Sequence, residues 1–243
     1  MINRRRNIAG SLAFTLIELL VVVAIIALLI AILLPSLNRA RLQAKNAVCL
    51  ANLHANTQTM YNYAAEWDGR LPSEDPNDAS VAGGQLYWDM TSTMADNLLG
   101  RSGNLRKIYY CPLSPDQNID ALWNFSSGYR VLGYYYYNQR KNKSTQALIL
   151  PKYAKLTTLP HGSLDDMELI SDIVLSDQNN ASNFSNISLS GLPGHVFTTS
   201  HFVGSTPSGG NISFIDGHVE WRPFNKMQKQ YTSVSSDKYF EWF

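Results

Sequence analysis

The sequence predicts an α+β protein in which one long N-terminal helix is followed by a domain built on an antiparallel β-sheet. Three observations support this fold class. An apolar run lies near the start of the chain, a helical repeat of small residues continues beyond it, and short runs typical of strands fill the second half. With 243 residues, 45% hydrophobic and 16% charged, the chain suits one membrane segment and one globular domain.

The apolar run, residues 14–34, contains a single charged residue, Glu18, and neither Gly nor Pro. At about 1.5 Å per residue it forms a helix roughly 31 Å long, enough to cross a bilayer core. A secretory signal has a shorter apolar region with small residues after it. Here the small residues precede the run, within a basic leader at residues 1–13. We therefore predict a single-pass membrane helix that any leader cleavage leaves in the mature protein.

The charge distribution argues against nucleic acid as a partner. The formal net charge is +1, and the leader holds three arginines, Arg4 to Arg6, and no acid. Outside the leader the chain has 17 basic and 19 acidic residues. A chain so balanced predicts no broad basic surface, so lipid is the expected partner and nucleic acid is not.

The helical pattern continues past Pro35, where we expect a kink, as an amphipathic extension over residues 35–68. Apolar and small residues recur there every three to four positions. This repeat predicts that the helix continues, and its small residues would let another helix approach closely. Its members are Leu37, Ala40, Ala44, Val48, Ala51 and Ala55. The helix should end near Asp68-Gly69, because Gly commonly follows the last helical turn.

The two cysteines, Cys49 and Cys111, are too few for a disulfide scaffold, and their spacing matches no zinc pattern. They allow one disulfide at most, which an extracytoplasmic location would permit. Alternatively, Cys49 is a small apolar residue on the helix. The sequence leaves both interpretations open.

Residues 69–243 are expected to form the β-rich globular domain. Its predicted strands are 107–111, 129–138, 146–150, 169–175, 196–200 and 211–222. The Asn- and Ser-rich stretch 177–191 is expected to be a surface loop. In the tyrosine run 134–137, strand alternation would bury two rings and leave two at the surface.

The clearest local signal in this domain is Asp216-Gly217 between two alternating segments, which predicts a two-residue type I′ hairpin turn. Pairing Ile215 with His218 then places four residues together on a buried face and leaves His218 exposed. The four are Ile212, Phe214, Val219 and Trp221.

A carboxylate inside a membrane span is the least expected feature of the chain. It costs roughly 2.5–3.5 kcal/mol on insertion scales, so Glu18 needs a partner. Cleavage between Ala13 and Phe14 would free an α-amino group one helical turn away, on the same chain or a neighbouring one. A tolerated acid near the membrane interface is the alternative.

These N-terminal residues resemble the type IV pilins and the type II secretion pseudopilins. The resemblance rests on a basic leader, then Phe14 as first mature residue, Glu18 as fifth and Pro35 as twenty-second. It implies cleavage by a prepilin peptidase, methylation of the Phe14 amine, and assembly with other pilin or pseudopilin subunits through the helix. The family usually has Gly before the cleavage point, and this chain has Ala13.

Three further segments, residues 49–72, 109–112 and 209–221, resemble a subgroup of large bacterial pseudopilin-like proteins. That subgroup is named for a His, nine intervening residues and Asp-Gly. Here 14 residues separate His201 from Asp216. The name of that subgroup implies no biochemical role. From the N-terminal resemblance we predict a structural, non-enzymatic subunit in the bacterial cytoplasmic membrane, with its C-terminal domain outside the cytoplasm.

Two other function classes have weaker support. One is a single-pass anchored binding protein that does not polymerise. The other is a membrane-tethered metal-dependent enzyme, for which the candidate ligands are His195, His201, Asp216 and His218. The acidic stretch at residues 73–82 is expected to be a solvated loop. Alternatively, it binds Ca²⁺ through Glu74, Asp75 and Asp78, as the resemblance allows because some pseudopilins bind calcium in a loop. We expect no cofactor beyond this candidate Ca²⁺.

Overall fold

The computed structural model describes residues 15–72, 88–137, 167–177, 180–185, 187–188, 196–234 and 237–242. The chain divides into two compact units, Met1–Ala44 and Lys45–Phe243. Several predictions lie outside the described residues: the processing site Ala13 and Phe14, the acidic loop with Glu74, Asp75 and Asp78, His195, and the strand 146–150.

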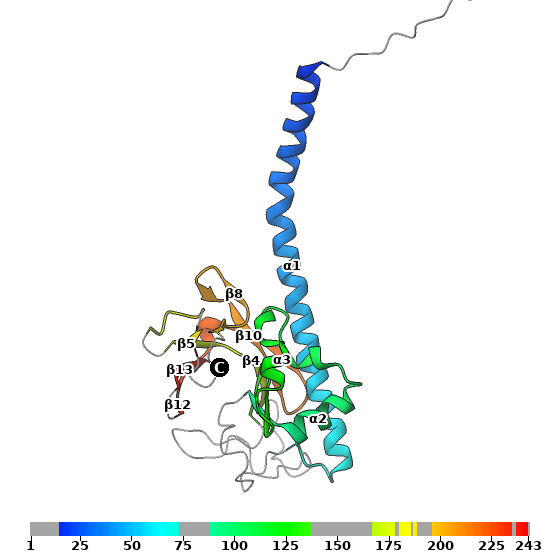
Figure 1. Ribbon diagram of the computed structural model, residues 1–243, viewed down its shortest axis with the longest axis vertical. Coiled ribbons are helices and arrows are strands. Elements are labelled where there is room, and N and C mark those ends of the chain that lie inside the picture. The colour runs from blue at the N-terminus through cyan, green and yellow to red at the C-terminus, as the bar shows by residue number, and fades with distance from the viewer. Residues whose placement is uncertain are drawn as a thin grey trace, which may run out of the picture. The chain divides into compact units, whose positions relative to one another are not determined.

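One helix, α1 (Leu16–Glu66), is followed by an antiparallel sheet domain, so the predicted α+β layout is confirmed (Figure 1). The helix continues through Pro35 without interruption. Its apolar part is long and apolar enough to span a membrane, and none of that window is buried within the chain.

The start of α1 is a capping box, which the sequence interpretation did not identify. The Thr15 hydroxyl accepts a hydrogen bond from the Glu18 backbone N–H at 3.2 Å, and the Glu18 carboxylate accepts one from the Thr15 N–H at 2.9 Å. Each side chain thus satisfies a backbone donor that lacks an intrahelical partner. Glu18 therefore has a local partner as well as the one expected from cleavage.

The end of α1 lies where the sequence predicts it. Asp68 and Gly69 have φ values of 56° and 75°, and the Gly69 N–H donates to the Ala64 carbonyl at 2.7 Å. A left-handed residue closing a hydrogen bond back onto the last turn is the usual way a helix terminates.

The stripe of small residues noted in the sequence is not the face that α1 buries in the domain. Val48, Ala51 and the small residues before them are exposed, and Ala55 is half-buried. The buried residues instead follow a neighbouring stripe: Cys49, Leu53, Asn56, Thr57, Thr59, Met60 and Ala64. Several of these are polar, so apolar periodicity did not detect them. Asn56 is stable there because its side-chain N–H donates to the Ile108 carbonyl at 2.6 Å.

The main sheet has four antiparallel strands in the order β11-β10-β4-β3. They are β3 (Tyr134–Tyr136), β4 (Glu168–Asp172), β10 (Gly209–Phe214) and β11 (Val219–Pro223). A three-stranded sheet, in the order β12-β13-β5, contains β5 (Leu175–Asp177), β12 (Lys229–Val234) and β13 (Asp237–Trp242).

The remaining strands form two-stranded antiparallel pairs. They are β1 (Asp89–Thr91) with β2 (Tyr129–Val131), β6 (Ile187–Ser188) with β7 (Val196–Phe197), and β8 (Phe202–Val203) with β9 (Thr206–Pro207). The short helices are α2 (Ser92–Arg101), α3 (Asp120–Trp123), η2 (Arg106–Tyr109), η3 (Pro115–Gln117) and η4 (Phe224–Lys226).

Two predictions about these segments need correction. The strand predicted at 107–111 is largely η2, and only Tyr110 makes a bridge, to Gly133. The stretch predicted as a loop at 177–191 contains β6. Periodicity alone cannot assign such short runs to a strand or to a helical turn, because they are shorter than the window over which the two periods differ clearly.

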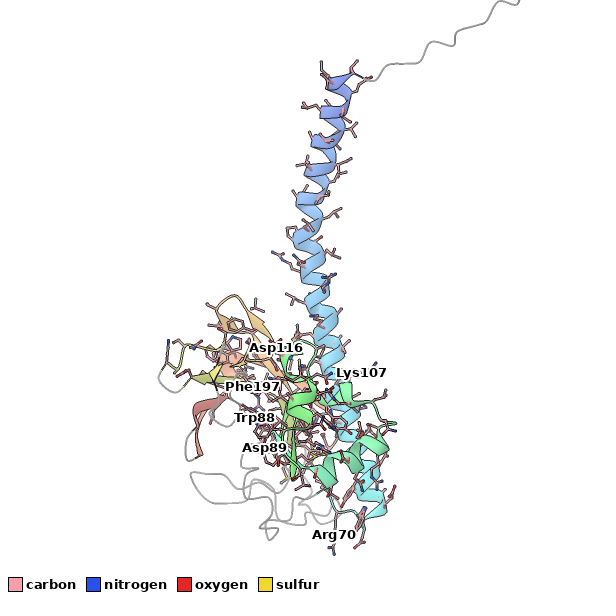
Figure 2. The ribbon with its side chains drawn as sticks, viewed as in Figure 1. Arg70, Trp88, Asp89, Lys107, Asp116 and Phe197 are labelled. Carbon is pink, nitrogen blue, oxygen red and sulfur yellow. The ribbon has the colours of Figure 1, made fainter. Side chains whose placement is uncertain are left out.

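All four rings of Tyr134 to Tyr137 are buried, which contradicts the expectation that two lie at the surface. The alternation itself holds: Tyr134 and Tyr136 face the cluster that includes α1, while Tyr135 and Tyr137 face a second apolar cluster. That second cluster includes Trp88 and Phe197, whose rings stack 5.4 Å apart (Figure 2). Both faces of β3 are therefore covered.

The hairpin of β10 and β11 exists, but its predicted register is wrong by one residue. Ser213 pairs with Val219, and the Phe214 N–H donates to the His218 carbonyl at 3.0 Å. The loop is thus Ile215-Asp216-Gly217, and Gly217 has a φ of 95°. A three-residue loop with Gly in the left-handed region replaces the type I′ turn.

Because the register differs by one residue, the four residues predicted to share one apolar face do not share it. Ile212 and Phe214 are buried, but they share their face with Glu220 and His218, whereas Val219 and Trp221 are only partly buried. His218 is exposed, as expected, and its ring stacks on Phe214.

Candidate metal centre

Four buried side chains with metal-ligating atoms meet where α1 contacts the main sheet. They are Cys49, Cys111, Asp172 and His201, each no more than 2% exposed. Their ligand atoms all lie within 4.8 Å of one another. This is the one group of at least three such residues that the described part of the chain brings together.

The contacts within the group converge on one carboxylate and one ring nitrogen. Asp172 Oδ1 accepts from Cys49 Sγ at 2.9 Å, and Asp172 Oδ2 lies 2.6 Å from His201 Nε2. Cys111 Sγ lies 3.6 Å from the same Nε2. Both cysteines are free thiols. The structure therefore brings together the pair that the sequence singled out, but without a disulfide.

The sheet topology places Asp172 at the centre of the group. It ends β4, which lies between β3 and β10, and it pairs with Tyr134 of β3 (Figure 1). On the other side, the backbone and side-chain N–H groups of Asn211 donate to Asp172 Oδ2 at 2.7 and 2.9 Å. Tyr134 OH lies 3.5 Å from Cys49 Sγ. Neighbouring strands thus orient the carboxylate and one thiol.

Two short segments position the other ligands. Cys111 follows Tyr110, whose bridge to Gly133 fixes the segment beside β3. His201 lies in the turn before β8 with a φ of 55°, a value uncommon for a residue other than Gly. Its carbonyl accepts hydrogen bonds from the backbone N–H and the hydroxyl of Ser208, which hold the turn. The rings of Trp221 and His201 pack in a T-shaped arrangement, with their centroids 5.0 Å apart.

Burial and mutual attraction have opposite effects on the ionisable groups. Burial disfavours charge on both Asp172 and His201, but their attraction outweighs it. The pKa of Asp172 is therefore lowered, and that of His201 is raised to about 10. Burial, with Cys111 and Asp172, raises the pKa of Cys49 well above its ordinary value. Burial acts in the same direction on Cys111, yet hydrogen bonds to Cys49 and His201 lower its pKa.

This geometry is suited to chelation and not to nucleophilic catalysis. In a Cys-His-Asp relay the thiol and the carboxylate contact different ring nitrogens. Here Cys111 and Asp172 both contact Nε2 of His201, while Nδ1 is buried with no hydrogen-bond partner among the described residues.

The candidate ligands chosen from the sequence are only partly those of this centre. His201 belongs to it, but Asp216 and His218 form their own pair in the β10–β11 turn, where Nδ1 of His218 lies 2.6 Å from the carboxylate. Asp172 and Asn211 were not predicted. A signal for Asp172 was present: it is an acidic residue within the apolar run LISDIVL, and a buried carboxylate requires partners.

Comparison of the chain with protein-family models, with curated proteins and with solved structures gives no match. The functional argument therefore rests on the residues themselves.

Proposed function

We propose that this chain is a structural subunit of a pilus-like fibre, either a type II secretion pseudopilus or a type IV pilus-like filament, in the bacterial cytoplasmic membrane. A prepilin peptidase would remove residues 1–13, and methylation of the Phe14 amine would follow. The membrane helix would then anchor the subunit before assembly, with the sheet domain outside the cytoplasm.

One observation carries this proposal: the first part of α1 is apolar on all sides, and none of its apolar window is buried among the residues that the structure describes. Every residue from Leu16 to Leu42 is exposed, including leucines and isoleucines around the whole circumference. A helix that is apolar all round requires lipid or other helices as its environment. A membrane anchor needs only lipid around this helix. A fibre subunit needs lipid before assembly and neighbouring helices after it.

The exposed small residues of α1 favour neighbouring helices over lipid alone. The stripe of small residues noted in the sequence is exposed at Ala40, Ala44 and Ala51. Small side chains allow two helix backbones to approach closely. Since the sheet domain uses a different stripe, this one is available to an adjacent subunit.

N-terminal mass spectrometry of the membrane-extracted protein tests the proposal. We expect a chain that begins at N-methylated Phe14 in cells with an active prepilin peptidase, and an intact Met1 in cells without the enzyme. An intact leader in both strains would contradict the proposal and favour the anchored binding protein that does not polymerise.

A further inference from the structure

We propose that Cys49, Cys111, Asp172 and His201 bind one zinc ion in a closed, four-coordinate structural site that joins α1 to the main sheet. This inference is independent of the proposed fibre function, because it concerns the interior of the sheet domain.

The ligand types select the metal. Two thiolates and an imidazole favour zinc over the hard cations Mg²⁺ and Ca²⁺, which prefer oxygen. Zinc also accepts a carboxylate oxygen as a ligand, whereas Cu(I) favours soft sulfur ligands. Four protein ligands leave no open position for water, which is typical of a structural site and not of a catalytic one.

The distances are compatible with a tetrahedral ion after a small expansion. Zinc bonds of about 2.0–2.3 Å at tetrahedral angles place sulfur and nitrogen ligands roughly 3.6 Å apart, and Cys111 Sγ lies 3.6 Å from His201 Nε2. Two contacts are shorter, at 2.6 and 2.9 Å, because hydrogen bonds from His201 and Cys49 close them onto Asp172. An ion would replace these shared protons and move the atoms apart by about 0.7 Å.

The surroundings supply the contacts that zinc ligands usually have. Asn211 donates two hydrogen bonds to Asp172, and Tyr134 lies beside Cys49. Such neighbours orient the ligands before the ion arrives. Two thiolates and one carboxylate around Zn²⁺ carry a net charge of about −1, which these donors offset.

The site would join four segments that are distant in sequence. Cys49 comes from α1, Cys111 from the segment after η2, Asp172 from β4 and His201 from the turn before β8. Because such a site does not exist in the unfolded chain, the free energy of zinc binding contributes directly to folding. The ion would also keep two adjacent thiols from oxidising to a disulfide.

The test begins with the full chain, purified in detergent without an immobilised-metal step and analysed for bound metal. We expect about one zinc per chain, and near-complete loss in His201→Gln. The matched control is His218→Gln, which alters an exposed histidine that also contacts an aspartate and should retain its zinc. Equal zinc content in the two variants, or no zinc in the wild type, would overturn the proposal.

A second measurement does not depend on how the variants fold. The wild-type chain, exchanged into cobalt, should show thiolate-to-cobalt charge-transfer absorption, and the chain contains only two cysteines that can produce it. Absence of this band would refute the site. So would peptide mapping under non-reducing conditions that finds Cys49 joined to Cys111 in the wild type.

Discussion

At the scale of single residues, polar side chains hold the outer part of α1 against the sheet domain. Asn56 is 2% exposed, and its amide donates to Ile108 while its carbonyl oxygen accepts from Tyr136 at 3.3 Å. Tyr61 reaches from the same helix to the hairpin turn, where its hydroxyl donates to the Ile215 carbonyl. Burial, together with the charge of Asp216, raises the pKa of Tyr61 to about 12, so this hydroxyl remains a donor at neutral pH.

Replacement of Asn56 by Ala should destabilise the domain by roughly 2–4 kcal/mol. The change leaves a buried carbonyl at Ile108 and the hydroxyl of Tyr136 without this partner, and each unsatisfied group costs about 1–3 kcal/mol. Gln58→Ala is the matched control, since Gln58 is exposed two residues away on the same helix and should cost less than about 0.5 kcal/mol. Denaturant unfolding of both variants in detergent measures the difference, and equal values would show that Asn56 is not buried.

At the scale of elements, the turn of the β10–β11 hairpin requires a positive φ at one residue and not at two. Gly217 has a positive φ, whereas Asp216 does not, and the Tyr61 ring lies 3.2 Å from where a Gly217 side chain would begin. The Asp216 carboxylate instead accepts from the His218 N–H at 3.0 Å. A type I′ turn would place both residues in the left-handed region and make both sensitive to substitution.

Gly217→Ala should therefore cost about 1–2 kcal/mol through its backbone conformation, with more from the contact with Tyr61. Asp216→Ala should cost at most about 1 kcal/mol, the value of a typical exposed turn hydrogen bond. Unfolding measurements on the two variants distinguish the loops: comparable losses at both positions would support the two-residue turn, and a much larger loss at Gly217 supports the three-residue loop.

The sequence predicts features that depend on residues close together along the chain better than features that depend on distant ones. The limits of α1 were predictable because they depend on local signals. The apolar run marks the start of the helix, and Asp68 and Gly69 mark its end. The hairpin was predictable as an element, yet its register was not, since β10 also pairs with β4 and all six of its residues are buried, so that alternation does not mark one buried face. The metal centre joins residues up to 152 positions apart, so only its ligand types, and not their grouping, could be identified from Cys49, Cys111 and His201.

At the scale of the whole molecule, the two parts of α1 have different surroundings. The stripe from Cys49 to Ala64 is buried in the sheet domain, and none of the apolar window before it is buried among the described residues. Glu18 lies at the start of that apolar part, and two different roles can be assigned to it. It completes the capping box with Thr15, and in the proposed fibre its charge would attract the Phe14 amine of an adjacent subunit.

Two variants separate these roles of Glu18. Glu18→Gln removes the charge but keeps a side chain that can complete the capping box. Thr15→Ala removes the cap, at about 1 kcal/mol of helix stability, and keeps the charge. If attraction to a neighbouring amine drives assembly, it acts in a low-dielectric environment and is lost only with the charge. We therefore expect Glu18→Gln to accumulate as a cleaved membrane monomer, while Thr15→Ala still assembles.

Crosslinking in intact membranes measures this outcome directly. Wild type and Thr15→Ala should give similar ladders of oligomers, and Glu18→Gln should give monomer alone. Insertion provides the internal control, because loss of a charge that costs roughly 2.5–3.5 kcal/mol in the membrane should leave the amount of inserted Glu18→Gln equal or higher. A full ladder in Glu18→Gln would contradict the assembly role, and loss of the ladder in Thr15→Ala alone would assign Glu18 to helix capping.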